Sequence, residues 1–540
     1  MSDVESMDAS TIPVDDSPSA NISSFRKYTL LLLFCASQFL DAFNVSALFS
    51  AIPIMTTELD LNASEAVWLV SAYQLTFASF LLCSGRISDL YNPKYGFVVG
   101  NFTLGMFSLG AGFCDNKIGL FVLRALSGVS AAMTIPSSLT LLEQAGAIGV
   151  YGGSAALGNV LGLILGALLI QYANWSWVFW LGTLVATPVG LLALLLTPPQ
   201  PKVYKEGSKI SYLDLPGIFV VTAALILLIF AFTESGINSW SSAIVLAPLI
   251  ISIALIAFFF FYETWIPADK AAIPPSTWKY PNFGVLVGLA LSCYLWFAAT
   301  FFIIITMWQE VYLWSAVKSA VHFLPIGLIA GPLMLFSAPF TARFEAKYVL
   351  LTSIVLIMIS TVMLPFADSQ SKYWRLDFPA FVIGAIGGSL LFVNCNIAVF
   401  GNTPPEIAGV IGAAFNSALQ LGSAVGLAII TTIQLSVDGR GERDPTKNPY
   451  DGRAAAFWFL LAVMGVEGVA VLIFYRTKAS RPQDNSTQLE GGQDGVVEKE
   501  SGHPGELHRT NSSNTASQSA PLSRSDTVVE GEAEAKVKTS

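Results

Sequence analysis

Long apolar runs recur along most of this chain and limit the folds it can adopt. Of its 540 residues, 54% are hydrophobic and 12% are charged, whereas soluble domains carry about 25% charged residues. A run of about 20 apolar residues crosses the hydrocarbon of a bilayer, and we count about 14 of them, so we expect an all-α protein embedded in lipid. The runs begin near Tyr28, Glu65, Tyr95, Ile118, Gly149, Trp177, Leu213, Ser241, Asn282, Lys318, Tyr348, Phe378, Gly409 and Ala454.

The two ends of the chain differ from this apolar body. Residues 1–27 are acidic and Ser-rich and lack the pattern of a cleavable signal peptide. Residues 476–540 are rich in Ser, Glu, Gly, Gln and Thr, a composition too polar to form a core. We expect both segments to be disordered. An even number of spans places both termini on one side, and the Lys and Arg of the short loops predict that this side is cytoplasmic.

Charge and cysteine content suggest no further partner. The two termini carry −5 of the net charge of −9, and we expect no nucleic acid partner. Five cysteines stand singly, without the spacing of a disulfide framework or a metal site. Two glycosylation sequons, at Asn62 and Asn174, fall on the outer side but close to the membrane. Their glycosylation stays open.

An internal repeat organises the apolar body. The stretch 149–170, GVYGGSAALGNVLGLILGALLI, aligns without gaps on the stretch 409–430, GVIGAAFNSALQLGSAVGLAII. Both segments cross the membrane in the same direction, which indicates a parallel repeat of two halves. We expect a six-helix bundle over 28–197, a linker with two extra helices over 198–281, and a second six-helix bundle over 282–475. The alternative is a chance likeness of two Gly-rich helices.

A polar segment between the second and third runs carries the first recognisable motif. The sequence GRISDLYNPKY places Gly85 and Asp89 before Lys94. It resembles the signature between helices two and three of the major facilitator superfamily, although Asn92 and Pro93 replace residues that the family usually has. The resemblance implies a loop that gates the cytoplasmic side. A plain capped loop with a cytoplasmic Lys is the alternative.

Two charges lie inside apolar runs. Asp41 stands about halfway along the first run, and Arg124 precedes Gly128 in the fourth. Charged groups within a membrane are costly, so they normally face a cavity or a partner. Arg124 and Gly128 are similar to the family's fourth-helix signature, which implies a role in proton coupling. Asp41 is a candidate for proton or substrate coupling, against a purely structural hydrogen bond; for Arg124 the alternative is an interfacial side chain.

Further candidates come from glycines and amides. Gly158, Gly162 and Gly166 recur every fourth residue, so they form one stripe along a helix. The stripe resembles the family's antiporter signature, with Leu163 in place of its Pro; ordinary close helix packing is the alternative. In the second half, the polar residues that could line a cavity or join helices are Asn394, Asn416, Gln420 and Glu310.

Together, these segments resemble the fungal fourteen-helix drug:proton antiporters, in particular the aminotriazole-resistance-like efflux transporters. The resemblance implies export of a drug, toxin or secondary metabolite by alternating access, with a proton gradient and no cofactor. It also implies a monomeric multi-pass protein of the plasma membrane, or of a vacuolar or other internal membrane. An uptake carrier or a facilitator of a boric-acid-like solute is the alternative. A membrane enzyme or sensor has no support, because neither a nucleotide loop nor a nucleophile elbow is present.

Overall fold

The computed structural model describes residues 23–143, 148–198, 214–236, 238–267, 270–401, 403, 408–438 and 450–477. These residues form helices and connecting turns, and they contain no β-strand. Residues 1–22 and 478–540, which make up most of the two tails expected to be disordered, lie outside the described residues. So does the segment 199–213 at the start of the expected linker.

Six long helices occupy the first part of the chain. Each begins within four residues of its expected position, the largest difference being at the first helix, which begins at Ser24 rather than Tyr28. The bounds are α1 (Ser24–Glu58), α2 (Ala63–Leu90), α3 (Pro93–Gly112), α4 (Lys117–Glu143), α5 (Ile148–Tyr172) and α6 (Ser176–Leu196).

Nine α-helices follow in the part of the chain that the structure describes. Two of them, α10 and α11, meet at a bend of 44° and occupy the place of one expected run. The bounds are α7 (Leu215–Ser235), α8 (Ala243–Glu263), α9 (Phe283–Thr306), α10 (Ala316–His322), α11 (Leu324–Thr341), α12 (Ala346–Met363), α13 (Phe378–Gly401), α14 (Ala408–Asp438) and α15 (Asp451–Phe474). The short 3-10 or π segments are η3 (Pro275–Lys279), η4 (Met307–Val311), η5 (Leu364–Phe366), η6 (Gln370–Lys372) and η7 (Tyr373–Asp377).

The helices are those of a membrane protein. Within the described residues, 11 helical segments are long and apolar enough to cross a bilayer, or up to 12 if α10 and α11 form one bent span. The helices α2 and α3 are not among them, so the count of about 14 spans expected from the apolar runs is not confirmed. Large apolar side chains such as Phe219, Ile250 and Val466 are exposed on the helix surfaces, as expected where the surroundings are lipid.

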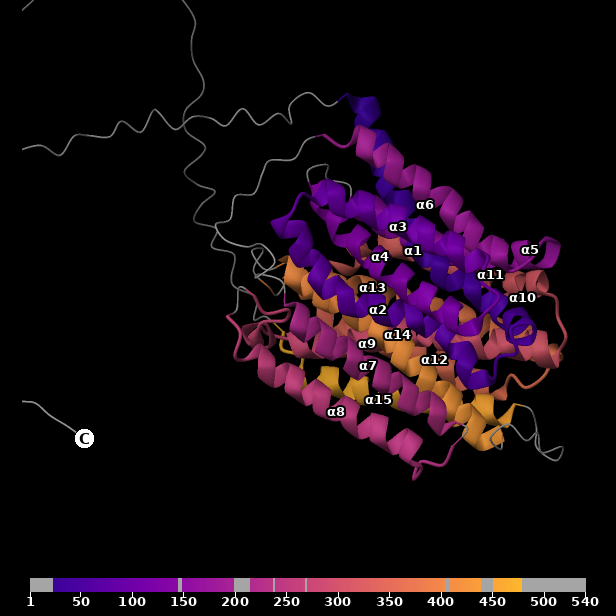
Figure 1. Ribbon diagram of the computed structural model, residues 1–540. Helices are drawn as coiled ribbons and strands as arrows, with labels where there is room; N and C mark the ends of the chain where they lie inside the picture. Colours follow the sequence, from indigo (N-terminus) through magenta and orange to yellow (C-terminus); the bar gives the residue numbers. More distant parts are fainter. Residues whose placement is uncertain are drawn as a thin grey trace, which may run out of the picture. The chain divides into compact units, whose positions relative to one another are not determined.

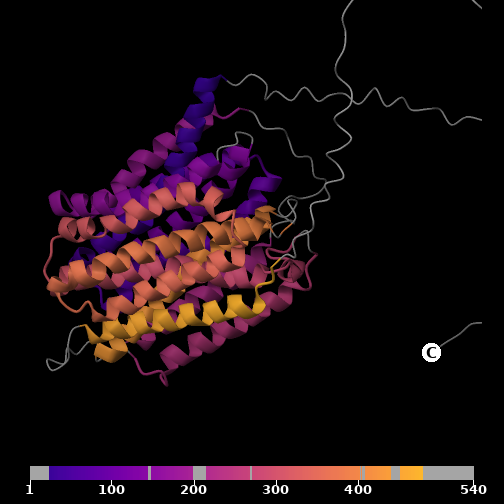
Figure 2. The same ribbon diagram turned by 180° about the vertical axis from the view of Figure 1, so that it is seen from behind.

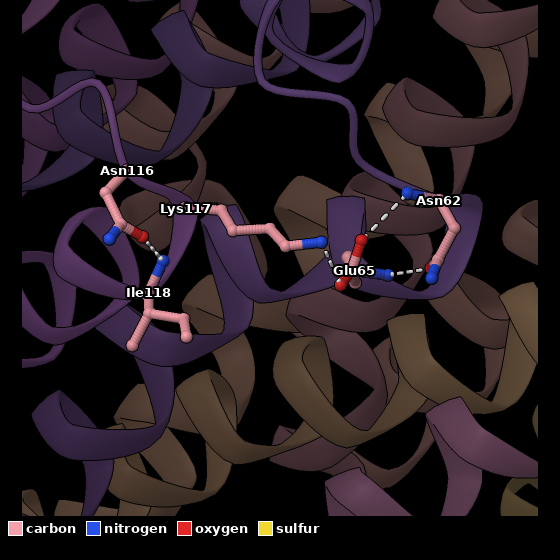
Figure 3. Close-up of polar contacts among 5 residues, drawn as sticks. All are labelled: Asn62, Glu65, Asn116, Lys117 and Ile118. Atoms are coloured by element: carbon pink, nitrogen blue, oxygen red, sulfur yellow. Dashed lines mark hydrogen bonds and ion pairs between the residues drawn. The ribbon is translucent and has the colours of Figure 1, made fainter.

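Local sequence signals set the helix ends. The Asn62 side chain accepts a hydrogen bond from Glu65 N at 2.7 Å, and the Glu65 carboxylate accepts one from Asn62 N at 3.0 Å, which together form a capping box. Glu65 also pairs with Lys117 of α4, with 2.7 Å between Nζ and Oε1 (Figure 3). The sequon residue Asn62 thus serves as a helix cap.

Equivalent helix pairs occur in the first part of the chain, α1–α6, and in the second part, α9–α15. The helix axes run side by side in the views of Figure 1 and Figure 2. In the first part α5 packs on α1, and in the second part α14 packs on α9. The parts meet where α2 contacts α14 and where α5 contacts α11. This arrangement leaves room for a site between the first six helices and the helices from α9 onward.

The helix α7 lies along the seam between α2 and α14 and packs against both. Ser64 of α2 donates a hydrogen bond to the Thr233 carbonyl at 2.9 Å. Thr432 of α14 donates one to the adjacent Phe232 carbonyl. The end of α7 is therefore bonded to helices from both parts of the chain, while α8 packs on the α7 helix.

Candidate functional site

A cavity of about 110 Å³ lies between the two parts of the chain. Its lining comes from α1, α2 and α5 on one side and from α9, α10, α11, α13 and α14 on the other. Most of the lining is apolar, with aromatic side chains from α9 and α13 that include Tyr294, Phe297 and Phe392. The polar or charged groups of the lining, apart from the Tyr294 hydroxyl, are Gln38, Asp41, Gln74, Asn159, Gln420 and Ser423. Such a surface suits an amphipathic small molecule, because a few polar groups orient a largely apolar ligand.

Asp41 brings a carboxylate to this cavity. It is buried in α1, and its Oδ1 accepts a hydrogen bond from the Tyr73 hydroxyl of α2 at 2.5 Å. The Tyr73 side chain is fully buried. A carboxylate within the membrane is a functional candidate by default, and here its hydrogen-bond donor is an uncharged hydroxyl.

Arg124 lies over the ring of the same tyrosine. Its guanidinium carbon is 4.6 Å from the centre of the Tyr73 ring, within the range of a cation–π interaction. Its Nε donates to the Leu69 carbonyl at 2.9 Å and one Nη donates to the Asn44 carbonyl at 3.3 Å. The other Nη is buried without a hydrogen-bond partner. Arg124 is therefore a buried side chain that is hydrogen-bonded to the backbone of α1 and α2.

Three glutamines add amide groups around Asp41. Gln38 and Gln74 lie on the same side as Asp41, on α1 and α2, and Gln420 faces them from α14. The side-chain oxygen of each is buried without a hydrogen-bond partner. Buried polar atoms usually have a hydrogen-bond partner, so each of these three oxygens can still accept a hydrogen bond. These amides could bind polar groups of a ligand.

The other polar residues expected at a cavity lie elsewhere. Asn394 donates to the Leu390 carbonyl at 2.8 Å, and Asn416 donates to the Gly412 carbonyl at 2.9 Å, so each bonds to its own helix. Neither is among the described residues that line the cavity. Glu310 of η4 lines a second hollow near the C-terminal end of α1, with its Oε2 at 3.7 Å from the buried Arg453.

The glycine stripe of α5 packs directly on α1. A Cβ atom on Gly158 would lie 2.5 Å from the Phe39 carbonyl oxygen, and one on Gly166 would lie 2.6 Å from the Ala47 carbonyl oxygen. Gly162 has the same relation to Phe43 and Ser46. The stripe therefore lets two backbones approach closely, next to the turn of α1 that carries Asp41.

The equivalent glycines of the repeat do the same in the second part of the chain. Gly422, aligned with Gly162, leaves no room for a Cβ against the Leu291 carbonyl of α9. Gly426, aligned with Gly166, packs on the Leu295 side chain, also of α9. The aligned segments thus make equivalent contacts, α5 with α1 and α14 with α9.

The segment expected as a gating loop is mostly helical. Gly85 and Asp89 belong to the last turns of α2, and the Asp89 side chain lies outside the described part of the structure. The connection is short because Asn92 caps α3, accepting from Lys94 N at 3.0 Å, and Pro93 occupies the first helical position. The Lys94 ammonium donates to the Thr197 carbonyl, just after α6, at 2.8 Å. Similarly, the Lys347 ammonium near the start of α12 donates to the Leu472 carbonyl of α15 at 3.0 Å.

Sequence reasoning did not single out Tyr73, Gln74 or Gln38. A signal was present in the second run, where Ser71, Tyr73 and Gln74 crowd polar groups into an apolar helix. Their link to Asp41 could not be derived, because it depends on how α1 and α2 are rotated against each other. Within the described ranges, no three His, Cys, Asp or Glu side chains form a group that could hold a metal ion.

This architecture, two sets of membrane helices enclosing a central cavity with buried charges, is that of a membrane transporter. Residues 34–427 match the model of the Major Facilitator Superfamily, and the chain belongs to this family. Members of this family are transporters and not enzymes.

Individual relatives agree with this assignment. The multidrug transporter mfsC of Aspergillus fumigatus is 26% identical over 83% of this chain and 86% of its own length. The puromycin resistance protein pur8 of Streptomyces alboniger is 27% identical over 88% and 96%. A low affinity ammonium transporter of Saccharomyces cerevisiae is 25% identical over 77% and 81%.

Solved structures agree in fold alone. A crystal structure of an auto-inhibited POT family peptide transporter has a TM-score of 0.57 at 13% identity, covering 84% of this chain and 99% of that one. A mutant of the nucleoside transporter NupG has a TM-score of 0.54 at 12% identity, covering 84% and 100%.

Proposed function

We propose that this protein is a proton-coupled antiporter that exports a small amphipathic organic molecule by alternating access. The observation that carries the proposal is the buried arrangement of Asp41, Tyr73 and Arg124 beside the central cavity. A carboxylate and a guanidinium held inside a membrane are costly, and such groups typically mark proton or substrate pathways.

The proposed coupling follows from the chemistry of these three side chains. A proton on Asp41 cancels a negative charge at the cavity and leaves the positive charge of Arg124 in place. Release of that proton restores the charge that Tyr73 and Arg124 stabilise. Proton and substrate would then compete for binding at the same cavity. Because only one of them binds at a time, the proton would enter as the substrate leaves.

The direction of transport rests on relatives whose names describe drug resistance or export. The ammonium transporter among the relatives favours a second candidate, uptake of a small inorganic or ammonium-like solute. We place both termini in the cytoplasm, assign the protein to the plasma membrane, and treat it as a monomer of six, two and six helices.

Inside-out vesicles with an imposed proton gradient test the proposal. Puromycin should accumulate in wild-type vesicles when their lumen is acid, and Asp41→Asn should abolish this accumulation while leaving insertion and folding intact. Tyr73→Phe should keep the fold and reduce the gradient-driven flux, because it removes only the hydroxyl that donates a hydrogen bond to Asp41.

A matched control is Asp60→Asn, since Asp60 is exposed and its left-handed backbone suits Asn equally well. Wild-type flux in Asp41→Asn would reject Asp41 as the coupling residue. Methylammonium movement greater than that in vesicles without the protein, with no movement of puromycin, would favour the second candidate.

A further inference from the structure

A second carboxyl group lies inside the membrane, away from the central cavity. Glu467 projects from α15 toward α9, where its Oε2 is in hydrogen-bonding contact with the hydroxyl of Ser292. Ser292 is 1% exposed. Glu467 is not among the described residues that line the cavity, so the proposed coupling site does not use it.

The hydrogen bonds of Ser292 constrain the protonation of Glu467. The Ser292 hydroxyl also lies 3.0 Å from the Leu289 carbonyl oxygen, which can only accept a hydrogen bond. A serine hydroxyl has one hydrogen and two lone pairs. If that hydrogen goes to the Leu289 carbonyl, the contact with Glu467 is a full hydrogen bond only when the carboxyl group supplies the hydrogen.

The surroundings of Glu467 offer no charge to stabilise an ionised carboxylate. Among the described residues no Lys, Arg or His forms an ion pair with it. Lys347 of α12 binds the Leu472 carbonyl further along α15. The titratable neighbour on α9 is the buried Cys293 thiol, which itself contacts Cys395 of α13. An unpaired carboxylate in such a place would be costly, whereas a neutral carboxylic acid satisfies Ser292.

We propose that Glu467 is a second proton-binding site of this transporter, neutral in this conformation and donating to Ser292. Removing the proton would leave one serine hydrogen between two acceptors and an unpaired charge between α9 and α15. The protonation of Glu467 therefore controls the contact between these two helices. The consequence for transport rests on the proposed antiport, but the proton site itself does not.

Infrared spectroscopy of the full-length protein in lipid vesicles tests the proposal directly. A neutral carboxyl group gives a C=O stretching band that a carboxylate lacks and that shifts in heavy water. We expect wild type at neutral pH to show a band that is lost in Glu467→Gln and retained in Asp41→Asn. Glu467→Gln should fold, because its amide N–H can still donate to Ser292.

Ser292→Ala provides a second readout, since it should shift the same band without removing it. The same spectrum in the carboxylic acid region for wild type and Glu467→Gln would overturn the proposal, as would no shift in Ser292→Ala. Failure of the antiport proposal is a separate result: wild-type vesicles would then show no proton-driven flux although the band is present.

Discussion

The glycine stripe of α5 leads to a quantitative prediction, because the same substitution can be made where space is absent and where it is open. In Gly166→Ala the new Cβ would lie 2.6 Å from the Ala47 carbonyl oxygen and 2.7 Å from the Ala47 Cα. Ordinary contacts begin at 3.4 Å, so α1 and α5 must separate by about 0.8 Å. The obstructing atoms belong to the backbone and cannot turn aside. Overpacking of this kind costs about 1–3 kcal/mol.

Gly288→Ala in α9 is the matched control, because a Cβ there would meet nothing within 4 Å. Both substitutions gain about 1 kcal/mol of helix propensity in the host-guest scale, so this gain cancels in the comparison. Gly166→Ala should therefore be less stable than Gly288→Ala by about 1–3 kcal/mol, the overpacking cost alone.

Thermal unfolding followed with a thiol-reactive dye measures the difference, because Cys83, Cys293 and Cys395 are buried and become reactive on unfolding. Equal midpoints for the two variants would refute the close contact between α5 and α1. A Gly166→Ala variant of lowered stability but unchanged flux per folded molecule would show that the stripe serves packing rather than antiport.

Two further predictions concern the buried Arg124 and the α7 seam. Arg124→Lys keeps the charge but cannot reach both the Leu69 and Asn44 carbonyls, so one hydrogen bond to a charged group, about 1.5–3 kcal/mol, should be lost. The transport flux and the unfolding midpoint should both fall, and the flux of Arg124→Ala should be lower than that of Arg124→Lys. An equal loss of folded protein in the two variants would indicate a structural role only. Thr432→Val removes the hydroxyl bonded to the Phe232 carbonyl of α7 and should cost about 1 kcal/mol, read from the unfolding midpoint. Thr222→Val is its control, because the Thr222 hydroxyl bonds only within α7, to the Ile218 carbonyl; an equal effect of both would contradict a role for α7 at the seam.

The helix starts and the repeat could be predicted from the sequence because both depend on properties that act along the chain. An apolar run must be about 20 residues long to cross a bilayer, whatever it packs against. A capping box such as that of Asn62 and Glu65 joins residues only three positions apart in the chain. The alignment of Gly162 with Gly422 was visible because close helix approach requires glycine, and both positions do lie against a neighbouring backbone.

Two charged candidates, Asp41 and Arg124, were also evident from the sequence, because an ionisable group in an apolar run is conspicuous wherever it points. Their relation to each other was not evident. The structure places Tyr73 in contact with both, and it turns Asn394 and Asn416 toward carbonyls of their own helices. Polar side chains on a helix look alike in a sequence whether they face a cavity or a backbone carbonyl.

By itself, then, the sequence determined that this chain is a helical membrane protein with an internal repeat and with two charges inside apolar runs. Only the tertiary structure decided which helices pair, how each is rotated about its axis, and that α7 lies on the seam between α2 and α14. The physical reason is that hydropathy measures the preference of a segment for lipid, which a single helix satisfies alone. Rotation and pairing are set by contacts between helices that lie far apart in the chain, such as Gly166 on Ala47.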